Sequence, residues 1–524
     1  MRVIQRVVDS AGKLAGYIVV NRNNQSAFIN VYKARKNINN ISNLRLLRNG
    51  ALRLKSKVSE TTLISLNRNR LKHIVKNNPF KRDIQKDLTE WKNHKGHVVL
   101  EVQGARQIGK TTEVLKFAYS NYEYVIYVNM ANDRYGFEKI WGATYIGWFM
   151  TSYCDRANLP LYNDSNKTIL IIDEIQVSKA VYNTIRRLDK ELNCDVIVTG
   201  SYLGQVLQKD YFQPAGNLEK VKMFNISFKE FCNIFGVRDI LDEIDLYGKS
   251  DNKDYDKLFE IYDIYRQIGG YPLVLKEYAQ SRSIEKGLIV VQHILGMVYD
   301  ESRAYFKHGE EVVIFKSIYT VLVKEMIKNK RGNGSKTLQE LTKDIIDENK
   351  NEMVTKKEVY RAMNWLIECD IIGECDLYNN GDLYNISLAR KLYFTDCGIA
   401  NLLVRKIDGI EKSNAEGLLT EHFAFCEIRR LYGFYCTGGV KGETPKFMAY
   451  GNYELDFIIT DGDDTRYGIE VKTTDGNPKS LRAVLSKGMI DKGIVAKRTK
   501  GGYNAESKIT TIPIFAVGCR FPYV

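Results

Sequence analysis

A glycine-rich segment with a lysine and a threonine at its end is the clearest chemical signal in the sequence. Residues 104–111 read GARQIGKT, directly after the apolar run VVLEVQ and directly before the helical pattern TTEVLKFAY. Glycines let the backbone wrap closely around phosphate groups, and the N–H groups of a helix N-terminus favour negative charge. The pattern predicts that Lys110 neutralises the β- and γ-phosphates of ATP and that Thr111 offers its hydroxyl to Mg²⁺. The predicted ATP-binding residues of this segment are Gly104, Ala105, Arg106, Gln107, Ile108, Gly109, Lys110, Thr111 and Thr112.

Two further apolar runs end in polar residues that suit the same chemistry. Thr168-Ile-Leu-Ile-Ile172 is followed by Asp173 and Glu174. Asp173 suits the shell of Mg²⁺, and Glu174 suits a catalytic role in orienting or deprotonating the attacking water. The run DVIVTGS ends in Thr199 and Ser201, which either sense the γ-phosphate or cap a loop.

The elements around these residues predict an α/β fold. Between Gly96 and about Ile226, near-continuously apolar runs alternate with helical patterns. Such alternation is typical of a parallel sheet that is covered by helices on both faces. Parallel strands present their carboxyl ends at one edge, so the three polar strand ends are expected to meet there.

The rest of the chain divides by pattern into further predicted domains. Residues 1–70 read as a β-rich basic module with a hairpin at Asn49-Gly50, and residues 71–226 as the P-loop core. Residues 227–310 are mainly helical and open with the capping box Ser227-x-x-Glu230, which predicts a helical lid. Residues 311–400 read as three helices and two short strands, the order of a winged helix-turn-helix. Residues 401–524 return to mixed strands and helices.

The last domain carries a candidate metal site. Glu421, Asp456, Glu470 and Lys472 have the spacing E-x34-D-x13-E-x-K, which matches the PD-(D/E)xK nuclease arrangement. Period-2 alternation predicts that Leu455 and Phe457 share one strand face and leaves Asp456 on the other. Three converging carboxylates would hold Mg²⁺, and Lys472 would stabilise developing phosphate charge. The alternative is a structural network in which the acids pair with the lysine.

Several ordered motifs resemble a family of prokaryotic AAA-type ATPases. The motifs are GARQIGKTT, LIIDEIQ, VIVTGSYLGQVL, FNISFKEFC, IGGYPLVL, LYFTDCGIANLL, AEGLLTEHFAFCEI, ELDFII and IEVK, and they cover roughly residues 75–520. The resemblance implies ATP hydrolysis coupled to a conformational change, with Pro272 of the lid near the nucleotide. It also implies a C-terminal winged helix followed by a restriction-endonuclease-like fold of unassigned function.

One position departs from the pattern of that family. Members commonly have a Gly-Arg pair shortly after the TGS strand, whereas this chain has Asn217 at the matching place. If that arginine acts on the γ-phosphate, turnover is slow here, or another base such as Arg186 or Arg187 serves.

The positive charge is concentrated at one end of the chain. Of the net charge of +14, residues 1–98 hold 21 Lys or Arg against five acids, and the remainder is close to neutral. Such an end suits either a polyanion or simply a solvated surface. Lys356, Lys357 and Arg361 on the third winged-helix helix suit a DNA groove or a protein interface equally.

Two functions therefore remain open: an ATP-driven switch or motor on nucleic acid, with DNA favoured over RNA, and a scaffold ATPase whose C-terminal domains bind a protein. An oligomer is compatible with both.

Composition and cysteine usage predict the cellular compartment of the protein. The sequence contains no stretch of about 18 apolar residues and no apolar segment of a secretory signal, so we expect a cytosolic protein without a membrane partner. Nine cysteines without a CxxC pair indicate reduced, buried thiols, and six scattered histidines leave little for a zinc site. His422 is the only histidine beyond residue 308, so no serine or cysteine triad is supported.

Overall fold

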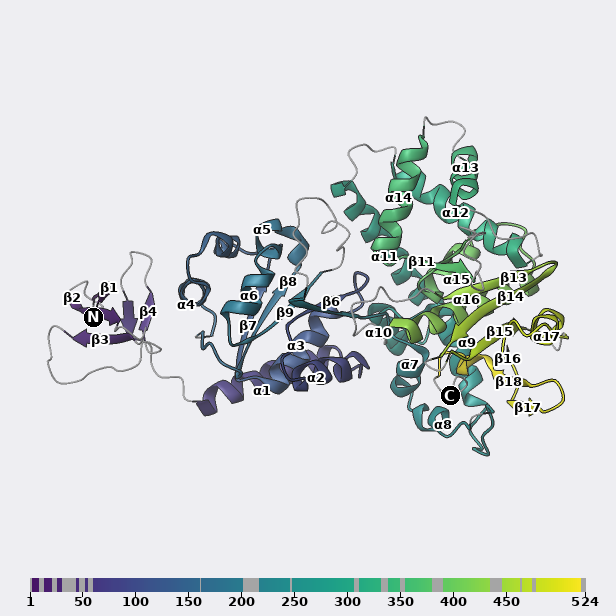
Figure 1. Cartoon of the computed structure of the whole chain (residues 1–524), viewed down its shortest axis with the longest axis horizontal. Coiled ribbons are helices and arrows are strands. Elements are labelled where there is room, and N and C mark those ends of the chain that lie inside the picture. Colours follow the sequence, from purple (N-terminus) through teal and green to yellow (C-terminus); the bar gives the residue numbers. More distant parts are fainter. Residues whose placement is uncertain are drawn as a thin grey trace.

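The computed structural model of the chain places its sheets in three successive regions (Figure 1). The amino-terminal strands lie at one end of the molecule, a parallel sheet lies in the middle, and a larger mixed sheet lies at the other end. The structure describes residues 2–8, 14–20, 26–30, 44–46, 52–54, 60–160, 162–200, 216–245, 247–305, 311–330, 338–348, 354–378, 390–433, 445–461, 464–473 and 477–519.

The amino-terminal region is built from short antiparallel strands. Strands β1 (Arg2–Val8), β2 (Leu14–Val20) and β3 (Ser26–Asn30) form one sheet in that order. Strands β4 (Leu44–Leu46) and β5 (Leu52–Leu54) pair across the predicted hairpin at Asn49-Gly50. Helix α1 (Glu60–Asn77) follows and packs on the helix after the glycine-rich loop, so the predicted boundary at residue 70 falls inside a helix.

The central region is a five-stranded, fully parallel sheet in the order β10-β6-β9-β8-β7. Its strands are β6 (Val99–Gln103), β7 (Tyr124–Asn129), β8 (Thr168–Asp173), β9 (Asp195–Thr199) and β10 (Leu218–Lys222). Its helices are α2 (Ile84–Asn93), α3 (Lys110–Asn121), η2 (Phe137–Gly142), α4 (Ile146–Arg156), η3 (Ile175–Val177), α5 (Lys179–Tyr182) and α6 (Ile185–Glu191). The predicted parallel α/β sheet is therefore confirmed.

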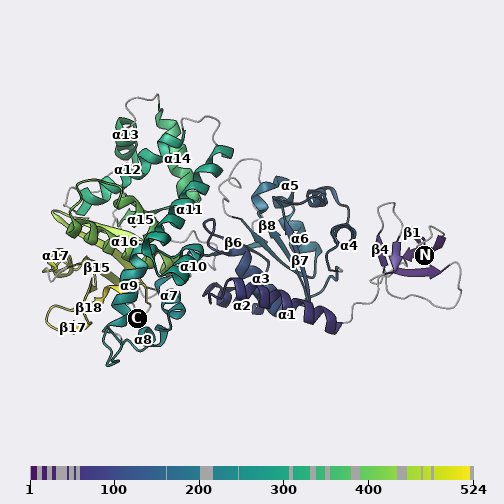
Figure 2. The same cartoon turned by 180° about the vertical axis from the view of Figure 1, so that it is seen from behind.

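Both faces of this sheet are buried, as the continuous apolar strands predict. Along β8, Ile169 and Ile171 belong to one core, and Leu170 and Ile172 belong to the other. Helices α2 and α3 cover the first face, and α4 and α6 cover the second (Figure 1 and Figure 2). Because β6 lies between β10 and β9, the loop after β6 emerges beside the end of β9.

The region after the sheet is helical, as predicted for the lid. Its helices are α7 (Phe228–Ile234), α8 (Arg238–Asp242), α9 (Lys257–Ile268), α10 (Pro272–Ser281) and α11 (Ile284–Tyr305). The predicted capping box is present: Ser227 accepts the N–H of Glu230, whose carboxylate accepts the N–H of Ser227.

The next region contains three helices and an antiparallel strand pair. The elements are α12 (Glu311–Lys330), α13 (Leu338–Glu348), α14 (Lys356–Glu368), β11 (Ile372–Leu377) and β12 (Arg390–Phe394). The predicted strand at residues 382–388 lies outside the described residues. Strand β11 also pairs with β13, so one sheet continues across the predicted domain boundary at residue 400.

That sheet has eight strands in the order β12-β11-β13-β14-β15-β16-β18-β17. The remaining strands are β13 (Lys446–Tyr450), β14 (Tyr453–Thr460), β15 (Arg466–Lys472), β16 (Lys492–Lys497), β17 (Gly502–Asn504) and β18 (Ile509–Pro513). The associated helices are α15 (Cys397–Val404), α16 (Lys412–Gly433), α17 (Lys479–Ser486) and η5 (Ile514–Ala516). Among the described residues, none of the helices combines the length and apolarity that crossing a bilayer requires.

Candidate nucleotide-binding site

The glycine-rich loop joins β6 to α3 in a conformation that its two glycines permit. Gly104 has φ +146°, and a Cβ atom there would lie 2.2 Å from the carbonyl oxygen of Met223. Gly109 is left-handed with φ +94° and is the N-cap of α3. L-residues with a side chain rarely adopt such angles, so the loop needs glycine at both places. Within the loop, the side chains of Ala105 and Ile108 are buried, and Thr112 is half-buried in the first turn of α3.

Lys110 is folded back into the loop. Its Nζ donates to the carbonyl oxygens of Gly104 at 2.8 Å and Ala105 at 2.7 Å. Burial lowers the pKa of Lys110 to about 8, against the opposing effect of Glu174 and Asp173. A buried ammonium group with a lowered pKa is stabilised by an anion, and a phosphate group would supply that charge at this place.

The ends of β8, β9 and α3 meet at Asp173. Its Oδ2 accepts the hydroxyl of Thr111 at 2.9 Å, and its Oδ1 accepts the hydroxyl of Thr199. Asp173 is 3% exposed, so this carboxylate is held by its hydrogen bonds within the core. The structure thus brings together the two residues predicted to bind Mg²⁺ and one of the two predicted sensors. Ser201, the other sensor, lies outside the described residues.

Two residues that the sequence analysis did not identify also hold Asp173. The hydroxyl of Tyr127 donates to Oδ2 at 2.7 Å, and the amide of Asn129 donates to the same atom at 3.4 Å. Both come from the end of β7, which pairs with β8 residue by residue up to Asn129 and Asp173. Burial, together with the bond to Asp173, raises the pKa of Tyr127, so this hydroxyl remains a donor. The run EYVIYVN showed the strand but not the partner of its polar end.

Glu174 stands at a sharp turn directly after the strand. Its backbone is left-handed, with φ 54°, and Gln176 donates to its Oε2 at 2.5 Å. A non-glycine residue in this conformation is strained, and such strain is concentrated at functional sites. The charge of Glu174 is near enough to oppose the lowering of the Lys110 pKa.

Helix α11, in the region predicted to be a lid, lies against the glycine-rich loop. Arg106 forms an ion pair with Glu301 of α11, and the Gln107 amide is 4.0 Å from the sulfur of Met297 on the same helix. Burial raises the pKa of Glu301, as does the nearby charge of Glu174, while Arg106 lowers it. The loop therefore pairs one of its cations with the lid, although the Arg106 side chain is still 42% exposed.

The segment between β10 and α7 connects the loop to the lid and to the C-terminal sheet. Ile226 N–H donates to Gly270 O at 2.8 Å, and Gly270 N–H donates to Asp396 Oδ2 at 2.8 Å. Asn225 also donates to Asp396, the N-cap residue of α15. Pro272, two residues after Gly270, is buried at the first position of α10.

Asn217, which stands where the family commonly has an arginine, forms a hydrogen bond to a side chain of α6. The amide of Asn217 donates to Asp189 at 2.5 Å on α6. Arg187 pairs with Glu191 and donates to the carbonyls of Trp141 and Ala143, while Arg186 is exposed. The substitute role considered for Arg187 therefore requires it to leave three partners.

The three C-terminal carboxylates do not converge on one point. Glu421 accepts the Tyr393 hydroxyl at 2.8 Å and lies 4.0 Å from Lys391, whose charge Asp456 also stabilises. Asp456 accepts the N–H of Val471 on β15 at 2.6 Å. Glu470 pairs with Lys472 at 2.7 Å and accepts the N–H of Leu481 at 3.2 Å. Among the described residues, Glu421, Asp456 and Glu470 do not form a group of ligand atoms within 4.8 Å of one another.

A register shift in β14 also changes which of its side chains share a face. Between β13 and β14, Lys446 pairs with Ile458 but Met448 pairs with Leu455, so β14 carries one extra residue. A bulge of this kind reverses the alternation of side chains. Leu455 accordingly packs with Leu481 in one core, and Phe457 packs with Ile469 in the other. The expectation that Leu455 and Phe457 share a face was wrong.

Two family models match parts of the sequence, and one of them covers the central sheet. A family model described as an AAA domain matches residues 96–232, and one described as a domain of unknown function (DUF8612) matches residues 260–410. None of the curated proteins compared matches the sequence.

Three similar solved structures are of low identity. A Walker-type ATPase of Pyrococcus abyssi is 16% identical over 62% of this chain and 95% of that chain, with a TM-score of 0.38. The Orc1 protein of Aeropyrum pernix, in complex with DNA, is 13% identical over 64% and 91%, with a TM-score of 0.26. The RuvB Holliday junction branch migration motor of Thermotoga maritima is 13% identical over 56% and 89%, with a TM-score of 0.26.

The C-terminal match has no assigned function, so the winged-helix and nuclease-like interpretations stay predictions. The AAA match and the five-stranded parallel sheet agree on the central region. Residues 96–232 therefore form an ATPase domain of the AAA, P-loop type.

Proposed function

We propose that this chain binds ATP with Mg²⁺ at the 104–111 loop, hydrolyses the nucleotide, and acts as a switch or motor on nucleic acid. The observation that carries the first part is the hydrogen bond between Thr111 and Asp173 at the end of β8. A hydroxyl and a carboxylate in contact supply the oxygen ligands that Mg²⁺ prefers, beside a lysine suited to phosphate.

The residues of the site would divide the chemistry between them. Lys110 and the N–H groups of the loop would hold the phosphates, and Thr111 and Asp173 would hold Mg²⁺, which supplies charge neutralisation when bound. Glu174 would orient and deprotonate the attacking water. Thr199, which donates a hydrogen bond to Asp173, would report the presence of the γ-phosphate to β9.

Nucleotide binding would be coupled to movement of the lid. The pair between Arg106 and Glu301 joins α11 to the loop that would surround the phosphates. A phosphate group competes with Glu301 for Arg106, because both are anions that the guanidinium can bind. We therefore propose that ATP releases α11 and that Gly270, Asn225 and Asp396 transmit this change toward the C-terminal sheet.

Replacing Glu301 by glutamine is expected to raise ATP affinity up to about fivefold. The neutral amide keeps the shape of the side chain but removes the ionic competition for Arg106, which is roughly 0.2–1 kcal/mol for a pair with an exposed partner. Isothermal titration with ATP and Mg²⁺ measures the change. Glu285→Gln, on the same helix but paired with Arg405, is the matched control and should bind as the wild type does. Equal or weaker binding by Glu301→Gln would show that the pair does not close the site.

The basic amino-terminal region supports an action on nucleic acid. Residues 1–98 carry all of the excess positive charge, because the rest of the chain is slightly acidic. Deleting residues 1–59 is expected to weaken DNA binding at least tenfold and to flatten its dependence on salt, since each lost phosphate contact removes about 0.9 from the slope on duplex DNA. The cut is placed before α1 because Asn67 donates to the carbonyls of Tyr122 and Glu123 and holds that helix on the ATPase domain.

The matched variant keeps the module and changes Arg45, Arg48 and Arg53 to glutamine, which separates its charge from its shape. Binding should fall in both variants while ATP turnover without DNA is retained. An unchanged salt slope in the truncated protein would favour the scaffold function, in which a protein partner takes the place of nucleic acid.

For the C-terminal sheet we propose binding rather than cleavage of nucleic acid. The three carboxylates of Glu421, Asp456 and Glu470 do not form one group of ligand atoms among the described residues, which supports this choice, because cleavage by this arrangement needs carboxylates that share an ion. The deciding experiment is an ATPase assay with and without DNA, run beside a nuclease assay with Mg²⁺ and Mn²⁺. DNA-stimulated turnover without cleavage supports the proposal, and metal-dependent cleavage would overturn its second part.

A further inference from the structure

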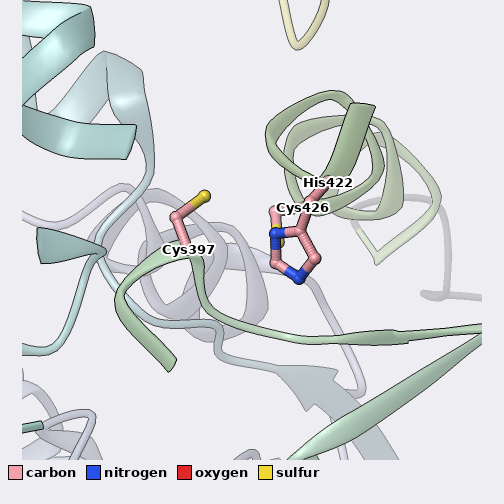
Figure 3. A group of neighbouring side chains, drawn as sticks. All are labelled: Cys397, His422 and Cys426. Atoms are coloured by element: carbon pink, nitrogen blue, oxygen red, sulfur yellow. The ribbon is translucent and has the colours of Figure 1, made fainter. Parts of the chain in front are cut away.

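Three side chains that lie far apart in the sequence meet in the core of the C-terminal half. Cys397, His422 and Cys426 each offer one ligand atom, and these atoms lie within 4.8 Å of one another. All three residues are buried, with exposed fractions of 3%, 0% and 4%. Figure 3 shows that Cys397 approaches from one segment while His422 and Cys426 project from a single helix. Among the described residues, this is the only such group of three or more.

Local structure places each of the three. Cys397 is the first residue of α15, whose N-cap Asp396 accepts the N–H groups of Gly398 and Ile399. His422 and Cys426 are four residues apart on α16, so they share one face of that helix. Helices α15 and α16 pack against each other, which brings the thiol of Cys397 to that face.

The distances suit a shared ion. The Sγ atom of Cys426 is 3.7 Å from Nδ1 of His422. Two ligands bound to one zinc ion, at about 2.3 Å for sulfur and about 2.0–2.1 Å for nitrogen, lie about 3.6–3.8 Å apart at tetrahedral or trigonal angles. The third ligand needs only a small movement to reach the same ion.

The two ring nitrogens of His422 differ in their surroundings. Nδ1 faces Sγ of Cys426, so Nδ1 is the nitrogen that would bind the ion. Nε2 is buried and has no hydrogen-bond partner among the described residues. An imidazole that binds a metal through Nδ1 keeps its proton on Nε2, so Nε2 is not a ligand of this ion.

We propose that Cys397, His422 and Cys426 bind a zinc ion. Two thiolates balance the charge of a dication in a site from which water is excluded, and the imidazole adds a neutral ligand. Mg²⁺ and Ca²⁺ prefer oxygen ligands, so the donor set selects a thiophilic metal. Binding releases the protons of both thiols. The carbonyl oxygen of Phe394 accepts a hydrogen bond from the thiol of Cys426 at 3.6 Å, so an oxygen atom that could also bind a metal lies beside the group.

The ion would stabilise the junction between lid and C-terminal sheet. Asp396, adjacent to Cys397, receives hydrogen bonds from Gly270 of the lid and from Asn225. Fixing α15 to α16 therefore fixes the residue to which the lid is attached. This role is structural and does not depend on the proposed ATP chemistry.

Metal content of the full-length chain, purified under reducing conditions from zinc-supplemented medium, tests the proposal. We expect about one zinc ion per chain in the wild type. The Cys375→Ala variant, which changes a buried cysteine on β11 outside the group, should bind the same amount. Cys397→Ala and Cys426→Ala should each contain at least tenfold less zinc per chain than the wild type. Removing the ion with a chelator should lower the melting temperature of the wild type but not of the two variants.

A second measurement needs no variant. Replacing zinc by Co²⁺ in the wild type should produce the intense near-ultraviolet band of thiolate-to-cobalt charge transfer. Wild-type protein that holds no zinc and shows no such band overturns the proposal, as does a disulfide between Cys397 and Cys426 in the reduced preparation.

Discussion

Lys110→Ala is expected to weaken ATP binding at least about 100-fold. The ammonium group would contact two phosphates, and each hydrogen bond between charged groups contributes roughly 1.5–3 kcal/mol, so its loss exceeds the 2.7 kcal/mol that corresponds to a factor of about 100. Isothermal titration with ATP and Mg²⁺ measures the affinity. Lys167→Ala is the control, since that lysine lies in the same domain and pairs with Glu123 at the surface.

The same variant separates binding from folding. Burial lowers the pKa of Lys110 to about 8, below the value of an unfolded lysine, so the charged side chain destabilises the ligand-free fold at neutral pH. Removing it should therefore leave the melting temperature of the ligand-free protein unchanged or higher. Retained ATP affinity in Lys110→Ala would remove the loop from the nucleotide site.

Glu174→Gln is expected to retain ATP affinity and to lose at least about 100-fold of the rate of hydrolysis. Glutamine has the shape of glutamate but cannot accept a proton, and general base catalysis contributes about 10²–10⁴ to a rate. Single-turnover hydrolysis of bound ATP measures the chemical step apart from binding.

Glu138→Gln, an exposed acid of the same domain, is the control and should hydrolyse ATP normally. If Glu174→Gln turned over at the wild-type rate, another residue would serve as the base. The strained backbone of Glu174 would then need a different explanation, such as the geometry of the turn before α5.

The positions of the strands along the chain and the identity of the loop could be predicted because both depend on local signals. Apolar runs of strand length, glycines before a helix and an acid after a strand are read from neighbouring residues. The meeting of Thr111, Asp173 and Thr199 was also predictable, because parallel strands end at one edge. The partners Tyr127 and Asn129 were not, because the neighbour of β8 depends on strand order.

The C-terminal carboxylates show where such reasoning ends. Alternation predicts faces only while a strand remains regular, and one extra residue in β14 changed the outcome for every side chain beyond it. Likewise, Arg106 could be identified as part of the loop, but its pairing with Glu301 arises from a helix nearly 200 residues further along the chain.

The sequence by itself therefore determined the phosphate loop, the acids that follow β8 and the parallel sheet that carries them, because each depends on residues adjacent in the chain. Only the tertiary structure decided that Leu455 and Phe457 lie on different faces, that α11 reaches the loop, and that Cys397 meets His422 and Cys426. These contacts are set by the packing of whole elements, and packing depends on the sum of many weak interactions that no short motif encodes.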